Sequence, residues 1–356
     1  MLPIFILDDS PVPARYGLTA SLWANQQQLP LWSLRPRFSG DFADSYQHVA
    51  RAGYCVTSGL FRSDTLQHET RDIGQLPTCD AVIVVAATDA ERVAHLPGRR
   101  FSSQTTGAAL LLRNGNETLL HFAVDANSLP SSPDPLRIGL FGSERDQRDA
   151  YPANLAALRA AADHLGVAPD IRFLSPAALS DTLHELDDLH GVVLPGGASM
   201  AVVRGQIAVA HATLQRNIPT LGLCLGMQSM CTAAVQRNDG FEQAMLAEVA
   251  PDAPIHSFVA FDDQRHRCGV LPFPADPPFN LMHYNHRYRF NPHLLPQLAA
   301  SDIVISAQTG DIVEGIAHPA HRFWQGLQGH PELMSRPHAP HPLFVDFLRA
   351  VFNLPA

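Results

Sequence analysis

The chain has 356 residues, of which 46% are hydrophobic, and this length is enough for two domains with a core each. Its formal net charge of −9 excludes the basic face that binding to nucleic acid requires, so we expect no nucleic-acid partner. The 25 residues of the Lys and Arg class are all arginine, which excludes a Schiff-base lysine, a lysine general base and a Walker A phosphate loop.

The first apolar segment, Leu2 to Leu7, has no basic residue before it and runs directly into Asp8 and Asp9. It is too short and wrongly flanked for a signal peptide or a membrane span, so we expect no membrane partner. The five cysteines show no paired spacing, which argues against a disulfide framework and favours a reducing compartment. We therefore expect a cytoplasmic protein.

Residues 1–127 are expected to form an N-terminal domain of unknown role. Segments 4–7 and 81–86 have the apolar composition of buried strands, and 108–124 is typical of a hairpin that turns on Asn114-Gly115. These elements predict a small α/β or α+β domain. Several acidic and histidine side chains lie in this region without the spacing of a metal motif, so we expect no metal site. They are Asp8, Asp9, His48, His68 and Asp89.

Residues 128–135, rich in proline and serine, are expected to be a linker. After it, apolar segments at 136–141, 191–195 and 218–223 predict strands, and helical patterns follow each of them. Alternating strands and helices favour a mostly parallel sheet covered by helices on both faces. Residues 136–356 are therefore expected to form an α/β domain, with its functional site beyond the carboxyl ends of the strands.

Cys224 stands between an apolar strand and a helix, with Gly222 and Gly226 two residues away on either side. This pattern is typical of a nucleophile elbow, because the glycines permit a tight turn that presents the side chain at the sheet edge. The helix start also favours the thiolate over the thiol. On this pattern alone, a buried cysteine in a tight turn explains the sequence equally well.

A second motif, Gly329-His330-Pro331-Glu332, supplies the partners that a catalytic cysteine needs. Such a cysteine requires a histidine to accept its proton and a third group to orient that histidine. Because the chain has 18 histidines, His330 is a candidate through its neighbours and not by itself. The interpretation is a catalytic set of Cys224, His330 and Glu332.

Three motifs follow one another along the chain, and their order and spacing are typical of one enzyme family. They are Pro195 to Gly197, Gly222 to Gln228, and Gly329 to Glu332. Together they resemble the class I glutamine amidotransferases, and the details are most similar to the C-terminal glutaminase domain of CTP synthases. The likeness extends over roughly 136–353. It implies a flavodoxin-like α/β fold, with a mostly parallel sheet between two layers of helices, for residues 136–356.

The resemblance also implies roles for individual residues. Cys224 would form a thioester with L-glutamine, His330 would transfer protons and Glu332 would orient it. Backbone amides of Gly197 and Leu225 would hold the oxyanion. Glu248 would face the substrate ammonium group and Arg287 its carboxylate. The glutamine site as a whole would comprise Gly196, Gly197, Leu225, Gly226, Met227, Gln228, Glu248 and Arg287. No cofactor is implied.

The sequence departs from the family pattern in three places. Met282 to Asn285 stands where the family has a run of basic residues before His286. Ala198-Ser199 stands where relatives carry Phe-Gly, and the N-terminal amidoligase domain of CTP synthases, with its P-loop and lysines, is not found in residues 1–127. CTP synthesis by this chain alone is therefore not expected. The ammonia would go to a separate synthetase or to another acceptor.

Two other functions remain open. The chain could hydrolyse another γ-glutamyl amide, because the same thioester chemistry applies and Ala198-Ser199 leaves room for a larger leaving group. It could also be a non-catalytic regulatory or scaffold protein related to CTP synthase. The sequence leaves the acceptor and the oligomeric state undecided, and a homo-oligomer is compatible with it.

Overall fold

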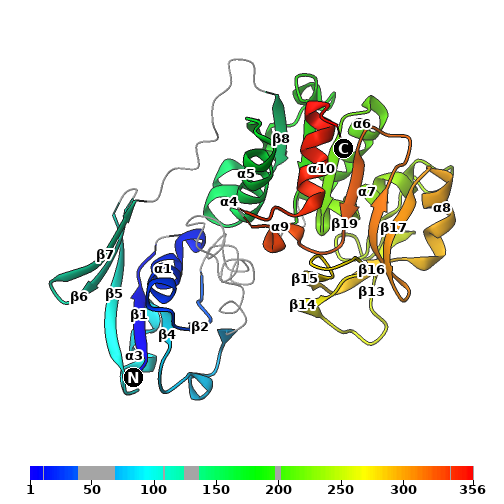
Figure 1. Cartoon of the computed structure of the whole chain (residues 1–356). Coiled ribbons are helices and arrows are strands. Elements are labelled where there is room, and N and C mark those ends of the chain that lie inside the picture. Colours follow the sequence, from blue (N-terminus) through cyan, green and yellow to red (C-terminus); the bar gives the residue numbers. More distant parts are fainter. Residues whose placement is uncertain are drawn as a thin grey trace. The chain divides into compact units, whose positions relative to one another are not determined.

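The structure is a computed structural model that describes residues 1–10, 12–38, 69–106, 109–123, 136–196, 202–336 and 338–355. The expected linker and the side chains of His48 and His68 lie outside these residues. The chain divides into two compact units (Figure 1). The first comprises Met1–Ser128 with Arg145–Ala157, and the second Leu129–Glu144 with Leu158–Ala356. No helix in the described ranges is long and apolar enough to cross a membrane.

The first unit is built on a seven-stranded sheet in the order β3-β2-β4-β1-β5-β6-β7. Pairing is parallel from β3 to β5 and antiparallel from β5 to β7. The strands are β1 (Ile4–Asp8), β2 (Leu31–Leu34), β3 (Glu69–Thr70), β4 (Val82–Ala86), β5 (Arg99–Thr106), β6 (Ala109–Asn114) and β7 (Glu117–Ala123). The helices are α1 (Leu18–Gln27), α3 (Ala90–Val93) and α4 (Glu144–Asp149).

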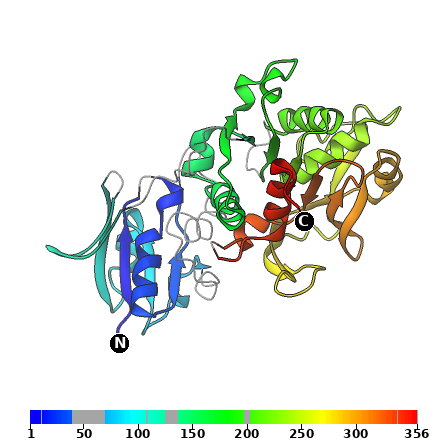
Figure 2. The same ribbon diagram turned by 45° about the horizontal axis from the view of Figure 1, so that its top comes forward.

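Strand β4 and residues 4–7 of β1 are apolar because both faces of the sheet are covered there. Ile4 and Ile6 of β1 pack with Ala20 and Ala24 of α1, which lies along one face (Figure 2). Phe5 points to the opposite face and packs in a second cluster. The α/β prediction for this region is confirmed. The expected hairpin is also present as β6 and β7, where Gly115 takes a φ of +59°.

The second unit contains a seven-stranded sheet in the order β17-β18-β19-β11-β10-β8-β9. Its five parallel strands are β8 (Arg137–Phe141), β9 (Asp170–Leu174), β10 (Gly191–Leu194), β11 (Thr220–Leu223) and β19 (Trp324–Leu327). Two antiparallel strands, β18 (Ile312–Ala317) and β17 (Val304–Thr309), extend one edge. Small sheets are formed by β12 (Met245–Leu246), β13 (His256–Ala260) and β16 (Tyr288–Phe290), and by β14 (Arg267–Pro272) and β15 (Leu281–His286).

Helices cover both faces of the large sheet. Val192 and Leu194 of β10 belong to the core cluster formed with α6 and α7, whereas Gly191 lies against Phe347 and Val351 of α10. The helices are α5 (Ala153–Leu165), α6 (Val203–Arg216), α7 (Leu225–Gln236), α8 (Leu295–Ala300), α9 (Pro331–Met334) and α10 (Pro342–Phe352). Short 3-10 helices lie at residues 13–15, 73–75 and 87–89 of the first unit and at 176–178, 184–186 and 292–294 of the second. The prediction of a mostly parallel sheet with helices on both faces is confirmed.

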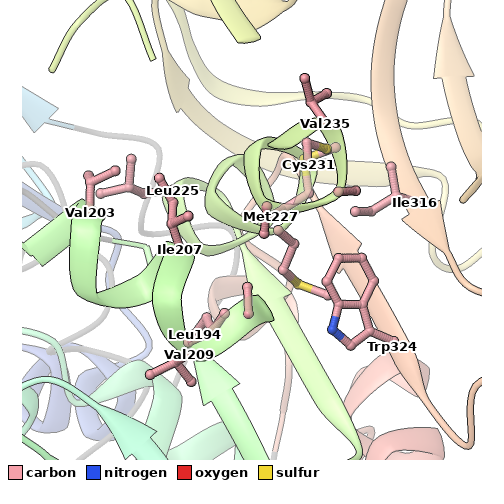
Figure 3. Packing of buried hydrophobic residues seen from close by; sticks show 14 of the residues in the cluster. Leu194, Val203, Ile207, Val209, Leu225, Met227, Cys231, Val235, Ile316 and Trp324 are labelled. Atoms are coloured by element: carbon pink, nitrogen blue, oxygen red, sulfur yellow. The ribbon is translucent and has the colours of Figure 1, made fainter. Parts of the chain in front are cut away.

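The core of the second unit fixes α7 against the strands that carry the candidate site. Figure 3 shows Met227 of α7 beside Trp324 of β19, with Cys231 and Val235 further along the helix. Met227 and Trp324 are fully buried. Burial of side chains of this size contributes about 1.5–3 kcal/mol each. The start of α7 is therefore held firmly at the sheet edge.

Candidate active site

Cys224 forms the junction between β11 and α7, with a φ of +48° and a ψ of −106°. Residues with a side chain rarely adopt this φ, so the surrounding structure must hold it. A Cβ on Gly226 would come within 1.8 Å of the Leu194 carbonyl oxygen, and one on Gly222 within 2.3 Å of the Met230 sulfur. The two glycines therefore allow the close approach of α7 to the sheet that makes this sharp turn possible.

Backbone hydrogen bonds fix the turn. The Cys224 amide donates to the carbonyl of Leu327 in β19 over 2.8 Å, and the Cys224 carbonyl accepts from the Gln228 amide over 3.0 Å. The amides of residues 225–227 lie in the first turn of α7, where the helix itself offers them no acceptor. Together with the helix dipole, these amides favour negative charge beside Cys224.

The other cysteine of α7, Cys231, has a different environment. Its side chain is fully buried in the core, and burial raises the pKa of the Cys231 thiol. A thiol kept protonated in this way is neither a nucleophile nor a metal ligand. Cys231 is therefore a packing residue.

His330 and Glu332 come to the same sheet edge as Cys224. The carboxyl ends of neighbouring parallel strands meet at one edge, and β10, β11 and β19 are neighbours. The His330 amide donates to the His283 carbonyl over 2.8 Å, which holds the residue after β19. Nδ1 of His330 lies 2.7 Å from Oε1 of Glu332, in the first turn of α9. Both side chains are buried.

Electrostatics decide the charge of His330. Burial by itself lowers the pKa of this imidazole, because it removes water from the charged form. The charges of Cys224 and Glu332, and their hydrogen bonds to the ring, act in the opposite direction and together raise the pKa well above 6.5. His330 is therefore held as an imidazolium between a sulfur and a carboxylate.

Gly196, which follows β10, leaves room for this arrangement. A Cβ at this position would lie 3.0 Å from Cε1 of His330 and 3.5 Å from Cβ of Cys224. A side chain here would therefore crowd the His330 ring, while its Cβ would be in ordinary contact with Cys224. The glycine thus lets the imidazole and the thiol come together at the sheet edge.

Gln328 is a further residue at the site, and the sequence interpretation missed it. Its Nε2 lies 3.8 Å from the Cys224 sulfur, and its Oε1 accepts a hydrogen bond from Nε2 of Gln228 over 3.3 Å. The signal was its place at the end of an apolar strand, two residues before His330. The motif used for the interpretation begins at Gly329, so it did not include Gln328.

A network of buried polar groups lies beside this edge. Arg267 pairs with Glu314 over 2.7 Å and donates to Nε2 of His286 over 3.1 Å. Nδ1 of His286 lies 2.7 Å from the Tyr288 carbonyl. Burial is the main cause that lowers the pKa of His286 to about 3, and the positive charge of Arg267 acts in the same direction. His286 is therefore neutral, with its proton on Nδ1.

Glu248 and Arg287 lie near enough to each other to interact electrostatically. Both side chains are exposed, and neither makes a side-chain hydrogen bond within the described residues. Partial desolvation raises the pKa of Glu248, and the charge of Arg287 opposes this shift. The pair presents one carboxylate and one guanidinium to a ligand. Within the described residues, no hydrogen bond joins either side chain to Cys224 or His330.

The remaining predicted site residues fall into two groups. Gly197 lies outside the described residues, as do Ala198 and Ser199. The side chains of Leu225 and Met227 are buried, and Met227 packs in the core (Figure 3), so these residues offer a ligand their backbone amides. Among the described residues, no group of three or more histidines, cysteines or acids is placed to hold a metal ion.

Comparison with known proteins gives one family and a consistent set of relatives. A family model described as "Glutamine amidotransferase class-I" matches residues 148–350. A CTP synthase from Aquifex aeolicus is 30% identical over 248 residues, which cover 63% of this chain and 46% of the relative. One from Methanothermobacter thermautotrophicus is 27% identical over 362 residues, which cover 86% of this chain and 67% of the relative. A Roseiflexus castenholzii CTP synthase is 34% identical, covering 60% and 43%.

Solved structures also match part of this chain, and one of them is a glutaminase domain. The glutaminase domain of Trypanosoma brucei CTPS with bound acivicin aligns with a TM-score of 0.57 and 24% identity. The alignment covers 62% of this chain and 95% of that domain. The chain thus spans about half the length of several of the curated relatives it matches.

Proposed function

This chain belongs to the class I glutamine amidotransferases, whose family model covers more than half of it, and we propose that it hydrolyses L-glutamine to glutamate and ammonia. The observation that carries the proposal is the meeting of Cys224, His330 and Glu332 behind neighbouring parallel strands. Cys224 is the nucleophile, because it stands at a helix start beside an imidazolium. The chain resembles the glutaminase domain of CTP synthases in sequence and fold.

In the first half of the reaction, the Cys224 thiolate attacks the side-chain carbonyl carbon of glutamine. The oxyanion that forms accepts hydrogen bonds from the amides of Leu225 and Gly197. His330 then donates its proton to the nitrogen, the C–N bond breaks, and ammonia leaves. A γ-glutamyl thioester remains on Cys224.

In the second half, the neutral His330 left by the first step takes a proton from water. The resulting hydroxide attacks the thioester, the C–S bond breaks, and the thiolate and the imidazolium are restored. The γ-carboxylic acid that is released loses its proton to solvent and becomes glutamate. Glu332 holds the ring orientation through its hydrogen bond to Nδ1 and stabilises the positive charge each time it forms.

We also propose that glutamine is recognised through its α-groups by Glu248 and Arg287. A carboxylate suits the substrate ammonium group, and a guanidinium suits its carboxylate. Gly196, Gly226 and Gln228 line the remainder of the site. The ammonia passes to a separate synthetase or another acceptor, which neither the site nor the relatives identify for this chain.

The test is glutamate release from L-glutamine by the purified wild type, Cys224→Ala and Cys79→Ala. Loss of the nucleophile should reduce turnover on the order of 10³-fold or more. The exposed Cys79 lies in the other unit, so its variant serves as the matched control and should equal the wild type. Turnover by Cys224→Ala at the wild-type rate would refute the proposal.

An inactive wild type would be informative as well. In that case the protein is treated with 6-diazo-5-oxo-L-norleucine, an electrophile on a glutamine-like skeleton, and the labelled peptide is identified by mass spectrometry. Labelling of Cys224 would mean that the site binds glutamine and waits for a partner. Absence of labelling would favour a non-catalytic scaffold protein.

A second candidate is hydrolysis of another γ-glutamyl amide. The sequence favours it, because Ala198 and Ser199 follow Gly197 where the family carries the bulkier Phe-Gly, and smaller side chains suit a larger leaving group. Competition of γ-glutamyl peptides against glutamine distinguishes the two, since a peptidase would prefer the peptides.

A further inference from the structure

We propose that Gln328 is a positioning residue for glutamine hydrolysis: its side-chain amide holds the Cys224 sulfur in its thiolate form and fixes the orientation of the Gln228 amide. The inference rests on the proposed function. It adds a residue that lies outside both motifs of the catalytic set.

The backbone holds Gln328 rigidly beside Cys224. Its amide donates to the Glu314 carbonyl of β18 over 2.8 Å, while the preceding carbonyl, that of Leu327, accepts from the Cys224 amide over 2.8 Å. Leu223 and Leu327 are paired in register, so Cys224 and Gln328 are the next residues on two adjacent strands. Glu314 is itself paired with Arg267. The side chain of Gln328 is fully buried and therefore has little freedom to move.

The amide of Gln328 has its donor on the side of the sulfur. Nε2 lies 3.8 Å from the Cys224 sulfur, and an N–H donor strengthens its interaction when the acceptor becomes negatively charged. A hydrogen bond to the charged form of a group favours that form. Gln328 thus supports the thiolate together with the imidazolium of His330 and the amides of the first turn of α7.

The same side-chain amide determines which group donates and which accepts in a short chain of hydrogen bonds. Oε1 of Gln328 accepts from Nε2 of Gln228, which leaves Oε1 of Gln228 as the end of the chain. This oxygen is buried and has no hydrogen-bond partner within the described residues. A buried acceptor without a partner is unfavourable, so the site is built for a ligand that brings an N–H donor. Glutamine carries two such groups, its side-chain amide and its ammonium group.

The test measures Cys224 itself, independently of turnover. The wild type, Gln328→Met and Gln228→Met are alkylated with iodoacetamide between pH 5 and 10, and Cys224 labelling is followed by peptide mass spectrometry. Methionine has a similar length and no N–H donor. For Gln328→Met we expect the pH of half-maximal alkylation to rise by about one unit, which is a tenfold change in the proton affinity of the thiolate.

The two variants separate the contact with sulfur from the packing of the amide pair. Both remove the Gln228–Gln328 hydrogen bond, but only Gln328→Met removes the donor to Cys224. Gln228→Met should therefore lower glutamine turnover while moving the alkylation midpoint by less than roughly 0.3 unit. Equal shifts in the two variants would overturn the inference. Gln308→Met, at an exposed glutamine on β17, is the matched control.

Failure of this inference is distinguishable from failure of the proposed function. An inactive wild type that also escapes labelling by 6-diazo-5-oxo-L-norleucine, together with a shifted Gln328→Met profile, would refute hydrolysis and support the role of Gln328. An active wild type with an unshifted Gln328→Met profile would support hydrolysis and overturn the role of Gln328. If Gln328→Met does not fold, Gln328→Glu keeps the shape and should shift the midpoint further, because it places a carboxylate beside the thiolate; no shift would overturn the inference.

Discussion

At the scale of single residues, the histidines of the second unit show how environment sets charge. His330 has carboxylate and sulfur neighbours that raise its pKa, whereas His286 is surrounded by Arg267 and buried surface that lower its pKa to about 3. His341 is also buried, and burial lowers its pKa to about 4. The same side chain thus serves as a cation at the candidate active site and as a neutral group in the core beside it.

His341 leads to a prediction about stability and pH. Its side chain caps α10 by accepting from the Leu343 amide over 3.3 Å, and its ring contacts Phe279. The folded pKa lies below the unfolded value of 6.5, so stability from this group is complete above pH 6.5 and decreases as pH falls towards about 4. At pH 5 the loss is about 1–2 kcal/mol.

His341→Asn tests this prediction, because asparagine also caps helices but does not titrate. Urea unfolding at pH 8 and pH 5 gives the free energies of unfolding. The wild type should lose about 1–2 kcal/mol more than the variant between these pH values. His293→Asn, at an exposed histidine of the same unit, should behave like the wild type. Parallel losses in the wild type and His341→Asn would contradict a lowered pKa.

At the scale of elements, the close approach of α7 to β10 determines where Cys224 lies. Gly226 is in the first turn of α7, directly against the Leu194 carbonyl. The hydrogen bond from the Cys224 amide to Leu327 ties the same turn to β19. A displacement of α7 would therefore move the nucleophile away from His330.

Gly226→Ala tests the role of this contact. We expect this substitution to destabilise the protein, whereas glycine to alanine in a helix usually stabilises it. Alanine in a helix normally adds up to about 1 kcal/mol of stability relative to glycine. Here the new Cβ would meet a carbonyl oxygen at 1.8 Å, and overpacking of this kind costs about 1–3 kcal/mol or more. Chemical unfolding should show destabilisation, and glutamine hydrolysis should be lost.

The control for this variant is Arg237→Ala, which truncates an exposed side chain at the end of the same helix. It should change the free energy of unfolding by less than about 0.5 kcal/mol. A Gly226→Ala protein as stable and active as the wild type would show that α7 can move away without consequence.

At the scale of the whole molecule, the chain joins a glutaminase-like unit to a first unit whose sequence carries no Walker A lysine. No lysine occurs in the sequence. At the end of β1, the buried carboxylate of Asp8 accepts from the amides of Ser10 and Gly17 over 2.9 Å each. This loop leads into α1, so the negative charge of a carboxylate lies beside the residue that precedes the helix and opposes the approach of a phosphate.

We therefore predict that the chain alone does not make CTP. The protein is incubated with UTP, ATP and Mg²⁺, with either glutamine or ammonium chloride as the nitrogen source, and nucleotides are separated by anion exchange. Glutamate should appear from glutamine, but no CTP should form with either nitrogen source. CTP formation from ammonium chloride would show that the first unit carries a synthetase site after all.

The sequence alone determined much of the second unit, because the signals are local. Strands at 136–141, 191–195 and 218–223 were predictable from apolar runs, and the structure places them at β8, β10 and β11. The expected roles of Cys224, His330 and Glu332 come from short motifs at strand ends, where a few neighbouring residues define the turn. The α/β fold followed from the alternation of strands and helices.

Only the tertiary structure decided which of these segments meet. Gln328 and Cys224 are 104 positions apart, and they touch because β19 pairs with β11, which no local pattern encodes. The Arg267–Glu314 pair and the neutral state of His286 depend on the same long-range packing. Local sequence sets the turns and the residue types, whereas burial and strand pairing set their neighbours and hence their charge.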